Sequence, residues 1–124
     1  MSENYAGDFP FWLAPEQIRL LPVTDEVRPY AAEVLARLKA AGVRATVDAS
    51  GDRLGKLIRT GEQMKIPVLA VIGAKEAESG RVSLRSRREG DLGSVAVADL
   101  LSASADANRE RAAGLGLTPA APAS

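Results

Sequence analysis

The sequence predicts an α/β fold, a three-layer sandwich built on a mainly parallel sheet. Three segments with strand character, residues 17–23, 43–47 and 68–73, alternate with two segments of helical periodicity. This order is typical of parallel strands joined by helices. The third strand (VLAVIG) is a continuous apolar run, as expected for a strand covered on both faces. A chain of 124 residues supports one domain with one core.

Prolines bound the first strand and open the first helix. Residues 17–23 (QIRLLPV) form the strand, and Thr24 with its neighbour Asp25 then offers a helix cap. Pro29 suits the first turn of a helix. Apolar residues recur from Tyr30 to Ala41 at the i, i+3, i+4 spacing of an amphipathic helix. Gly42 stands where a left-handed C-terminal cap belongs.

A second strand and a second helix follow. Residues 43–47 (VRATV) are rich in β-branched side chains and alternate in polarity, and residues 48–52 form a turn. An apolar stripe of helical spacing begins at Leu54 and continues to Met64. We expect Pro67 and the residue before it to end this helix.

The fourth predicted strand, residues 81–87, carries arginines on one face. Val82 and Leu84 share one side of the strand, and the other side holds Arg81, Ser83, Arg85 and Arg87. An acidic turn, residues 76–80, precedes it, so we expect the strand to add antiparallel at the sheet edge. Such arginines could simply stop an edge strand from pairing with other chains. As a set, they favour a negatively charged or base-like partner.

The two ends of the chain have distinct compositions. A last helix begins near Val97, with Leu100 and Leu101 as its clearest core contacts, and its alanine-rich distal half, residues 102–113, is expected to fray. Residues 1–16 hold four of the five aromatic side chains and two prolines, which forbid a helix there. We expect an extended strap whose rings pack on the domain surface or on a missing neighbour.

Composition excludes several classes of function. The chain has 16 Lys and Arg residues against 16 Asp and Glu residues, so a nucleic-acid site would have to be local. It contains no Cys and no His, which excludes disulfides, the usual zinc ligands and His-dependent catalytic triads within the chain. We find no apolar run long enough to span a bilayer and no signal-peptide pattern. A soluble, cytoplasmic protein without a membrane partner is expected.

A phosphate-binding loop is suggested by residues 50–57 (SGDRLGKL), which lie between a strand and a helix. Only three residues separate the two glycines, and Leu57 follows Lys56 where a hydroxyl side chain is needed. Nucleotide hydrolysis is therefore disfavoured, and with it a small enzyme on this frame. A helix N-terminus flanked by Arg53 and Lys56 could still meet a backbone phosphate.

Several segments resemble the C-terminal anticodon-binding domain of threonyl-tRNA synthetase. In order, they are FPFWLAPEQIRLLPVTDE, VRATVD, GKLIR, IPVLAVIGAKEAESGRVSLRSRR and DLGS. The resemblance runs from about Tyr5 to about Leu101, and the ESGRVSLRSRR run favours the threonine enzyme over the related histidyl, glycyl and prolyl enzymes. It implies a mixed sheet of about five strands with about three helices. It also implies a linker at 1–16, an anticodon-binding domain at 17–117 and a disordered tail at 118–124.

The resemblance implies that Glu76 and Arg85 contact anticodon bases. Threonine codons begin A-C, so threonine anticodons share G and U as their second and third letters. Unpaired anticodon bases can present their edges to side chains. A carboxylate accepts from guanine N1–H and its amino group, and a guanidinium donates to guanine O6 or uracil carbonyls. Candidates for contacts with the tRNA backbone, or for supporting roles, are Arg53, Lys56, Arg59, Arg81 and Arg87. The first three are explained equally well as charges on the solvent-exposed face of a helix.

One pair of residues departs from the family pattern. Where the family often carries Arg-Asn before the second helix, this chain has Ser50 and Gly51, so one base contact is missing or replaced. The resemblance places no catalysis and no cofactor in this chain, because ATP and zinc would belong to a parent catalytic domain. The chain would be a domain of a threonine–tRNA ligase or a freestanding relative. The expected partners are threonine tRNA, not DNA, and a synthetase catalytic domain; the alternative is a non-catalytic protein-interaction module.

Overall fold

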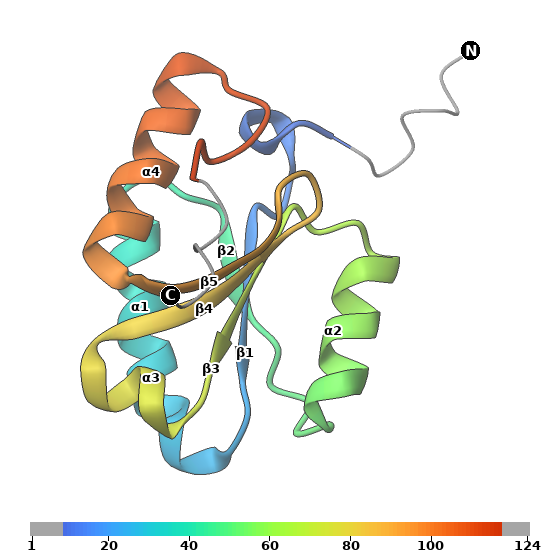
Figure 1. Ribbon diagram of the computed structural model, residues 1–124, viewed down its shortest axis with the longest axis vertical. Helices are drawn as coiled ribbons and strands as arrows, with labels where there is room; N and C mark the ends of the chain where they lie inside the picture. The colour runs from blue at the N-terminus through green and yellow to red at the C-terminus, as the bar shows by residue number, and fades with distance from the viewer. Residues whose placement is uncertain (1–8, 118–124) are drawn as a thin grey trace, which may run out of the picture.

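A five-stranded sheet lies at the centre of the computed structural model, which describes residues 9–117 (Figure 1). The strand order is β2-β1-β3-β4-β5. In sequence the strands are β1 (Ile18–Pro22), β2 (Ala45–Val47), β3 (Val68–Ile72), β4 (Arg81–Ser86) and β5 (Gly90–Ala96). The β1 strand pairs parallel with β2 and β3, whereas β4 pairs antiparallel with β3 and with β5. The predicted α/β class and mixed five-stranded sheet are confirmed.

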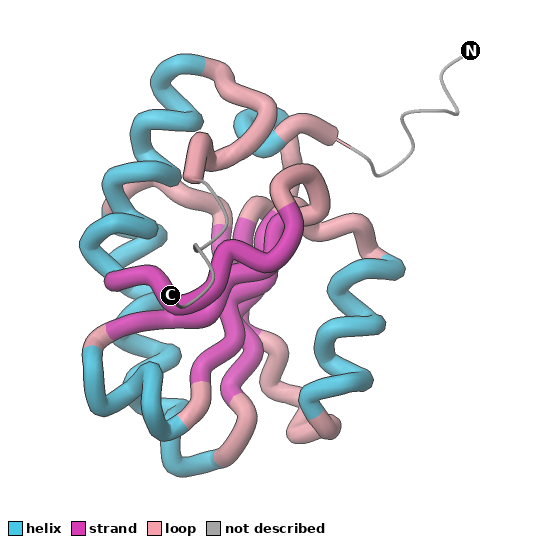
Figure 2. The backbone as a smooth tube through the Cα atoms, viewed as in Figure 1, coloured by secondary structure: helices cyan, strands magenta, loops and turns pink. Residues whose placement is uncertain are grey.

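The arginine-bearing strand is internal, so its predicted place at the sheet edge is wrong. Antiparallel pairing with β3 is as expected, but a tight hairpin turn at residues 87–89 returns the chain as β5, which pairs on the outer side of β4 (Figure 2). The β5 segment contains Gly90 and Gly93, and its polar and apolar residues do not alternate regularly. For this reason its residues did not indicate a strand. Protection of an exposed edge therefore does not explain the arginines.

Four α-helices surround the sheet in the described part of the chain, one more than predicted. They are α1 (Arg28–Ala40), α2 (Leu54–Gln63), α3 (Ala74–Ser79) and α4 (Val97–Glu110). The additional helix is α3, which replaces the predicted acidic turn and ends at Gly80 in the left-handed conformation (φ +70°). Gly42 likewise has a positive φ of +81° just after α1, as predicted. One 3₁₀ turn, Asp25–Val27, precedes α1.

Two apolar clusters hold the layers together. The larger cluster lies between one sheet face and helices α1 and α4, and it includes Ile18, Ala70 and Leu84. The smaller cluster lies on the opposite face, where Leu57 of α2 packs on Leu21 and Leu69 of β1 and β3. No strand residue of β4 or β5 belongs to this smaller cluster. As a result, α2 covers only the β1–β3 part of its face (Figure 1).

Both terminal segments are more ordered than the sequence predicted, as far as the structure describes them. Phe11 is fully buried in the main core, and residues 11–13 form one 3₁₀ turn although two prolines flank them. The distal half of α4 is helical to Glu110, because Ser104 and Ala107 are buried against the core. Residues 1–8 of the linker predicted at 1–16, and the tail predicted at 118–124, lie outside the described residues.

A fully buried glutamine joins these two segments. The Gln17 Nε2 donates to the carbonyl of Phe11 at 2.7 Å and to Oδ1 of Asn108 at 2.6 Å. Its Oε1 accepts from the backbone N–H of Arg44 at 3.0 Å. Gln17 therefore ties the N-terminal segment, the loop before β2 and α4 into one unit.

None of the described helices is long and apolar enough to cross a membrane.

Candidate nucleic-acid interface

The uncovered half of the α2-side sheet face is polar, and we call it the open face. It consists of Arg81, Ser83 and Arg85 of β4 with Asp91 and Ser94 of β5. Strand alternation places them there, because Val82 and Leu84 point into the core on the other side. Ser83 pairs with Ser94 and Arg85 with Asp91 across the two strands. The open face therefore displays donors and acceptors beside the edge of α2.

Glu76 reaches the open face from the first turn of α3. Its Oε1 accepts from the backbone N–H of Gly73 at 2.8 Å, and its Oε2 accepts from the hydroxyl of Ser83 at 2.9 Å. Partial burial alone raises the pKa of Glu76, but these hydrogen bonds outweigh it and hold the pKa below its ordinary value. At neutral pH the group is a fixed, ionised carboxylate that only accepts hydrogen bonds.

Arg85 lies further along the same side of β4. Its side chain is 44% exposed, and its guanidinium lies 4.0 Å from the Glu62 carboxylate of α2. An ion pair this exposed and this long contributes little, at most about 1 kcal/mol, so the guanidinium is available to another acceptor. Ser83 and Arg85 are two residues apart on one strand face, which separates them by roughly 7 Å. The structure thus brings Glu76 and Arg85 to the same face of the sheet.

The other two predicted arginines of this strand are engaged differently. The guanidinium of Arg81 donates to the hydroxyl of Ser94 at 2.7 Å and to its carbonyl at 3.0 Å. Arg87 lies just beyond the end of β4, where its Nη1 donates to the carbonyl of Glu62 at 3.4 Å. These bonds fit a supporting role for Arg81 and place Arg87 at the rim of the open face.

Three of the residues predicted to contact the RNA backbone lie along α2 or just before it. Arg53 immediately precedes its first residue, and Arg59 is exposed in its middle. Lys56 is also exposed, with its Nζ 3.8 Å from a carboxylate oxygen of Asp52. The Ser50–Gly51 turn is exposed and closed by its own hydrogen bonds, and Gly51 has a φ of +77°.

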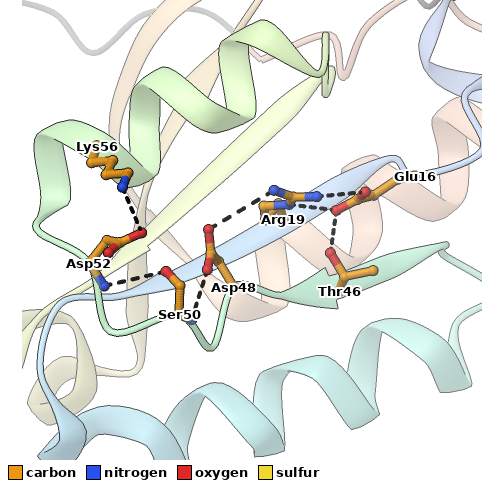
Figure 3. A network of polar contacts seen from close by, with 7 residues as sticks. All are labelled: Glu16, Arg19, Thr46, Asp48, Ser50, Asp52 and Lys56. Carbon is orange, nitrogen blue, oxygen red and sulfur yellow. Dashed lines mark hydrogen bonds and ion pairs between the residues drawn. The ribbon is translucent and has the colours of Figure 1, made fainter.

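A partly buried polar network beside this turn was not predicted (Figure 3). Arg19 donates to both carboxylate oxygens of Glu16, at 2.7 and 3.0 Å, and Thr46 donates to the same carboxylate. The guanidinium also lies 4.0 Å from Asp48, whose other oxygen accepts from the N–H of Ser50. The one available signal was a charged residue in the middle of an apolar strand.

The fold and the open face define a class of small α/β domains that offer a polar sheet face to a ligand. The family model described as "Anticodon binding domain" matches residues 17–105. This match covers more than half of the chain, so the chain belongs to the anticodon-binding domain family.

Similar proteins agree with this assignment. The chain is 80% identical over 117 residues to a threonine–tRNA ligase of Synechococcus sp. (strain CC9605), which covers 94% of this chain and 19% of that protein. A threonine–tRNA ligase of Thermosynechococcus vestitus is 62% identical over 100 residues, covering 81% of this chain and 16% of the relative. The chain thus spans about a fifth of the length of curated relatives that it matches.

Solved structures show the same architecture. The RNA-binding domain of threonyl-tRNA synthetase from Cryptosporidium parvum Iowa II is similar with a TM-score of 0.77 and 26% identity, covering 90% of this chain and 26% of that one. Histidyl-tRNA synthetase from Nostoc sp. PCC 7120 gives a TM-score of 0.67 and 28% identity, over 79% of this chain and 23% of that one. The predicted resemblance to the anticodon-binding domain of threonyl-tRNA synthetase is confirmed.

Proposed function

We propose that this domain binds the anticodon of threonine tRNA across the open face and reads its G and U. The observation that carries the proposal is the placement of the Glu76 carboxylate and the exposed Arg85 guanidinium on one side of β4. In an anticodon-binding domain, that pair offers an acceptor for the guanine N1–H and amino group and a donor for base carbonyls.

The remaining basic residues have supporting roles in this proposal. Arg53, Lys56 and Arg59 would contact the phosphates of the anticodon loop, and Arg87 would do so at the rim of the open face. Arg81 is held by Ser94 and would maintain the shape of β4 and β5. The domain would act within a cytoplasmic threonine–tRNA ligase, whose catalytic domain would supply the ATP and zinc chemistry.

Base readout predicts that changing either side chain weakens binding selectively. We expect Glu76→Gln and Arg85→Ala each to weaken binding of a threonine anticodon stem-loop about ten- to a hundredfold, since one good base contact is worth roughly 1–3 kcal/mol. Gln preserves the helix-capping contact to Gly73, because Glu and Gln both serve at this position. Fluorescence anisotropy with a labelled stem-loop measures the loss.

The matched controls remove similar charges from α1, on the other side of the sheet. Glu33→Gln and Arg37→Ala should leave affinity within about twofold, since both side chains are exposed on α1, which packs on the other face of the sheet. A second stem-loop carries A in place of the second-letter G, and the unmodified domain should bind it more weakly. Equal binding of the two stem-loops by the unmodified domain would contradict base readout.

A further inference from the structure

Ser83 carries the contact between the sheet and the Glu76 carboxylate. Its side chain is half-buried on the open face, and its hydroxyl donates to Glu76 Oε2 at 2.9 Å. The neighbouring hydroxyl, that of Ser94, is occupied by Arg81, which donates to it at 2.7 Å. The hydroxyl proton of Ser83 is therefore committed to the carboxylate, and the cross-strand neighbour is bound to a different partner.

Two donors on two oxygens fix the plane of a carboxylate. The Gly73 N–H holds Oε1 and the Ser83 hydroxyl holds Oε2. Either bond alone would leave the group free to rotate about its last side-chain torsion, which is broad for a terminal sp³–sp² bond. An ionised carboxylate has about four lone-pair sites, two on each oxygen. These two donors occupy one site on each oxygen, and the backbone N–H of Glu76 itself also lowers the pKa of the carboxyl.

The carboxylate lone pairs that Gly73 and Ser83 do not use match what a guanine edge requires. Guanine presents its N1–H and its amino group side by side, and a carboxylate accepts both only when its two oxygens lie in the plane of the base. On the basis of the proposed function, we propose that Ser83 is a positioning residue that sets the Glu76 carboxylate for a two-bond contact with the anticodon guanine. Ser83 acts through Glu76 and does not touch the base itself.

A near-isosteric pair of substitutions isolates the hydroxyl. Thr and Val have almost the same shape and are both favoured in strands, but only Thr keeps a hydroxyl donor. Ser83→Thr should therefore behave like the unmodified domain, whereas Ser83→Val removes the donor to Glu76. Ser83→Ala removes the same donor without adding bulk, so it replaces the Val variant if that one does not fold.

The test compares two anticodon stem-loops whose second letter is G or inosine, which lacks only the amino group. We expect the unmodified domain and Ser83→Thr to prefer G by about tenfold, as for the loss of one base contact. In Ser83→Val the preference should fall to about twofold or less. An unchanged preference in Ser83→Val and Ser83→Ala would overturn the positioning role, even if overall affinity dropped. If the unmodified domain does not distinguish G from A, the proposed function itself fails.

A second measurement needs no RNA. The side-chain carboxyl carbon of Glu76 can be followed by NMR while the pH is lowered. Loss of the Ser83 donor should raise the pKa of Glu76 in Ser83→Val and leave it unchanged in Ser83→Thr, because the hydroxyl bond favours the ionised form. Equal titration of Glu76 in the two variants would show that the hydroxyl does not hold the carboxylate, and this too would overturn the proposal.

Discussion

At the scale of single residues, the Glu16–Arg19 pair is a sharp stability test. The two side chains are only 19% and 12% exposed, and the guanidinium donates to both carboxylate oxygens (Figure 3). Glu16→Gln should destabilise the fold by about 1–3 kcal/mol, because it leaves a mostly buried guanidinium short of an acceptor. Urea unfolding measures the change. The control is Asp106→Asn, which breaks an exposed ion pair with Arg109 and should cost less than about 0.5 kcal/mol.

The same pair gives the stability a defined pH dependence. Burial raises the pKa of Glu16, but hydrogen bonds from Arg19 and Thr46 outweigh it and lower the pKa below its ordinary value. A carboxyl with a depressed pKa in the folded state stabilises the fold above its unfolded pKa, about 4.3, and this contribution is lost as pH falls through the folded value. The difference in stability between the unmodified chain and Glu16→Gln should therefore shrink below about pH 4. A constant difference down to pH 2 would contradict this account.

At the residue scale, the sequence predicted which side chains face away from the core, but it did not predict which residues they contact. The alternation in 81–87 correctly predicted which side chains leave the core, and the family resemblance pointed to Glu76 and Arg85. The contact of Ser83 with Glu76 depends on the position of α3 relative to β4, which no local sequence pattern records. The Glu16–Arg19 contact depends on the bend of the backbone at residues 15–16, just before β1.

At the scale of elements, the distal half of α4 carries a buried hydroxyl whose cost to stability can be measured. Ser104 is fully buried in the core, and its hydroxyl has no hydrogen-bond partner among the described residues. Ser104→Ala removes an unsatisfied hydroxyl and introduces the strongest helix former, so we expect a gain of about 0.5–1 kcal/mol. Thermal unfolding followed by circular dichroism measures it. The matched control is Ser102→Ala at an exposed position of the same helix, where stability should rise only by the smaller difference in helix propensity. An equal gain in stability in both variants would argue against a penalty for the buried hydroxyl.

The elements that sequence reasoning missed share a physical cause. The β5 strand is rich in glycine and holds its conformation through pairing with β4, a contact absent from its own sequence. The α3 helix has six residues, too few to show a helical period, and its first turn is capped by its own Glu76 side chain. The long amphipathic α1 and the buried β3 were predictable because each carries its whole signal within the segment.

At the scale of the whole molecule, zero net charge and a local site together should set the salt dependence of the proposed RNA binding. With 16 basic and 16 acidic residues, the domain has no general attraction for polyanions. The salt dependence of its affinity for RNA should therefore reflect the number of individual phosphate contacts. Four such contacts, by Arg53, Lys56, Arg59 and Arg87, predict a slope of about −3 in log K against log salt, at roughly −0.7 per phosphate of a single strand. Anisotropy titrations of the stem-loop from low to moderate salt measure that slope.

Removing one of these cations should change the slope by a predictable step. In Arg59→Ala the slope should become shallower by about 0.7, and binding to G- and A-containing stem-loops should weaken by the same factor, because a phosphate contact carries no base information. Lys39→Ala removes an equal charge from α1 on the opposite side of the sheet and should leave the slope unchanged. If both variants flatten the slope equally, the cations act through net charge alone, and α2 does not carry the RNA backbone.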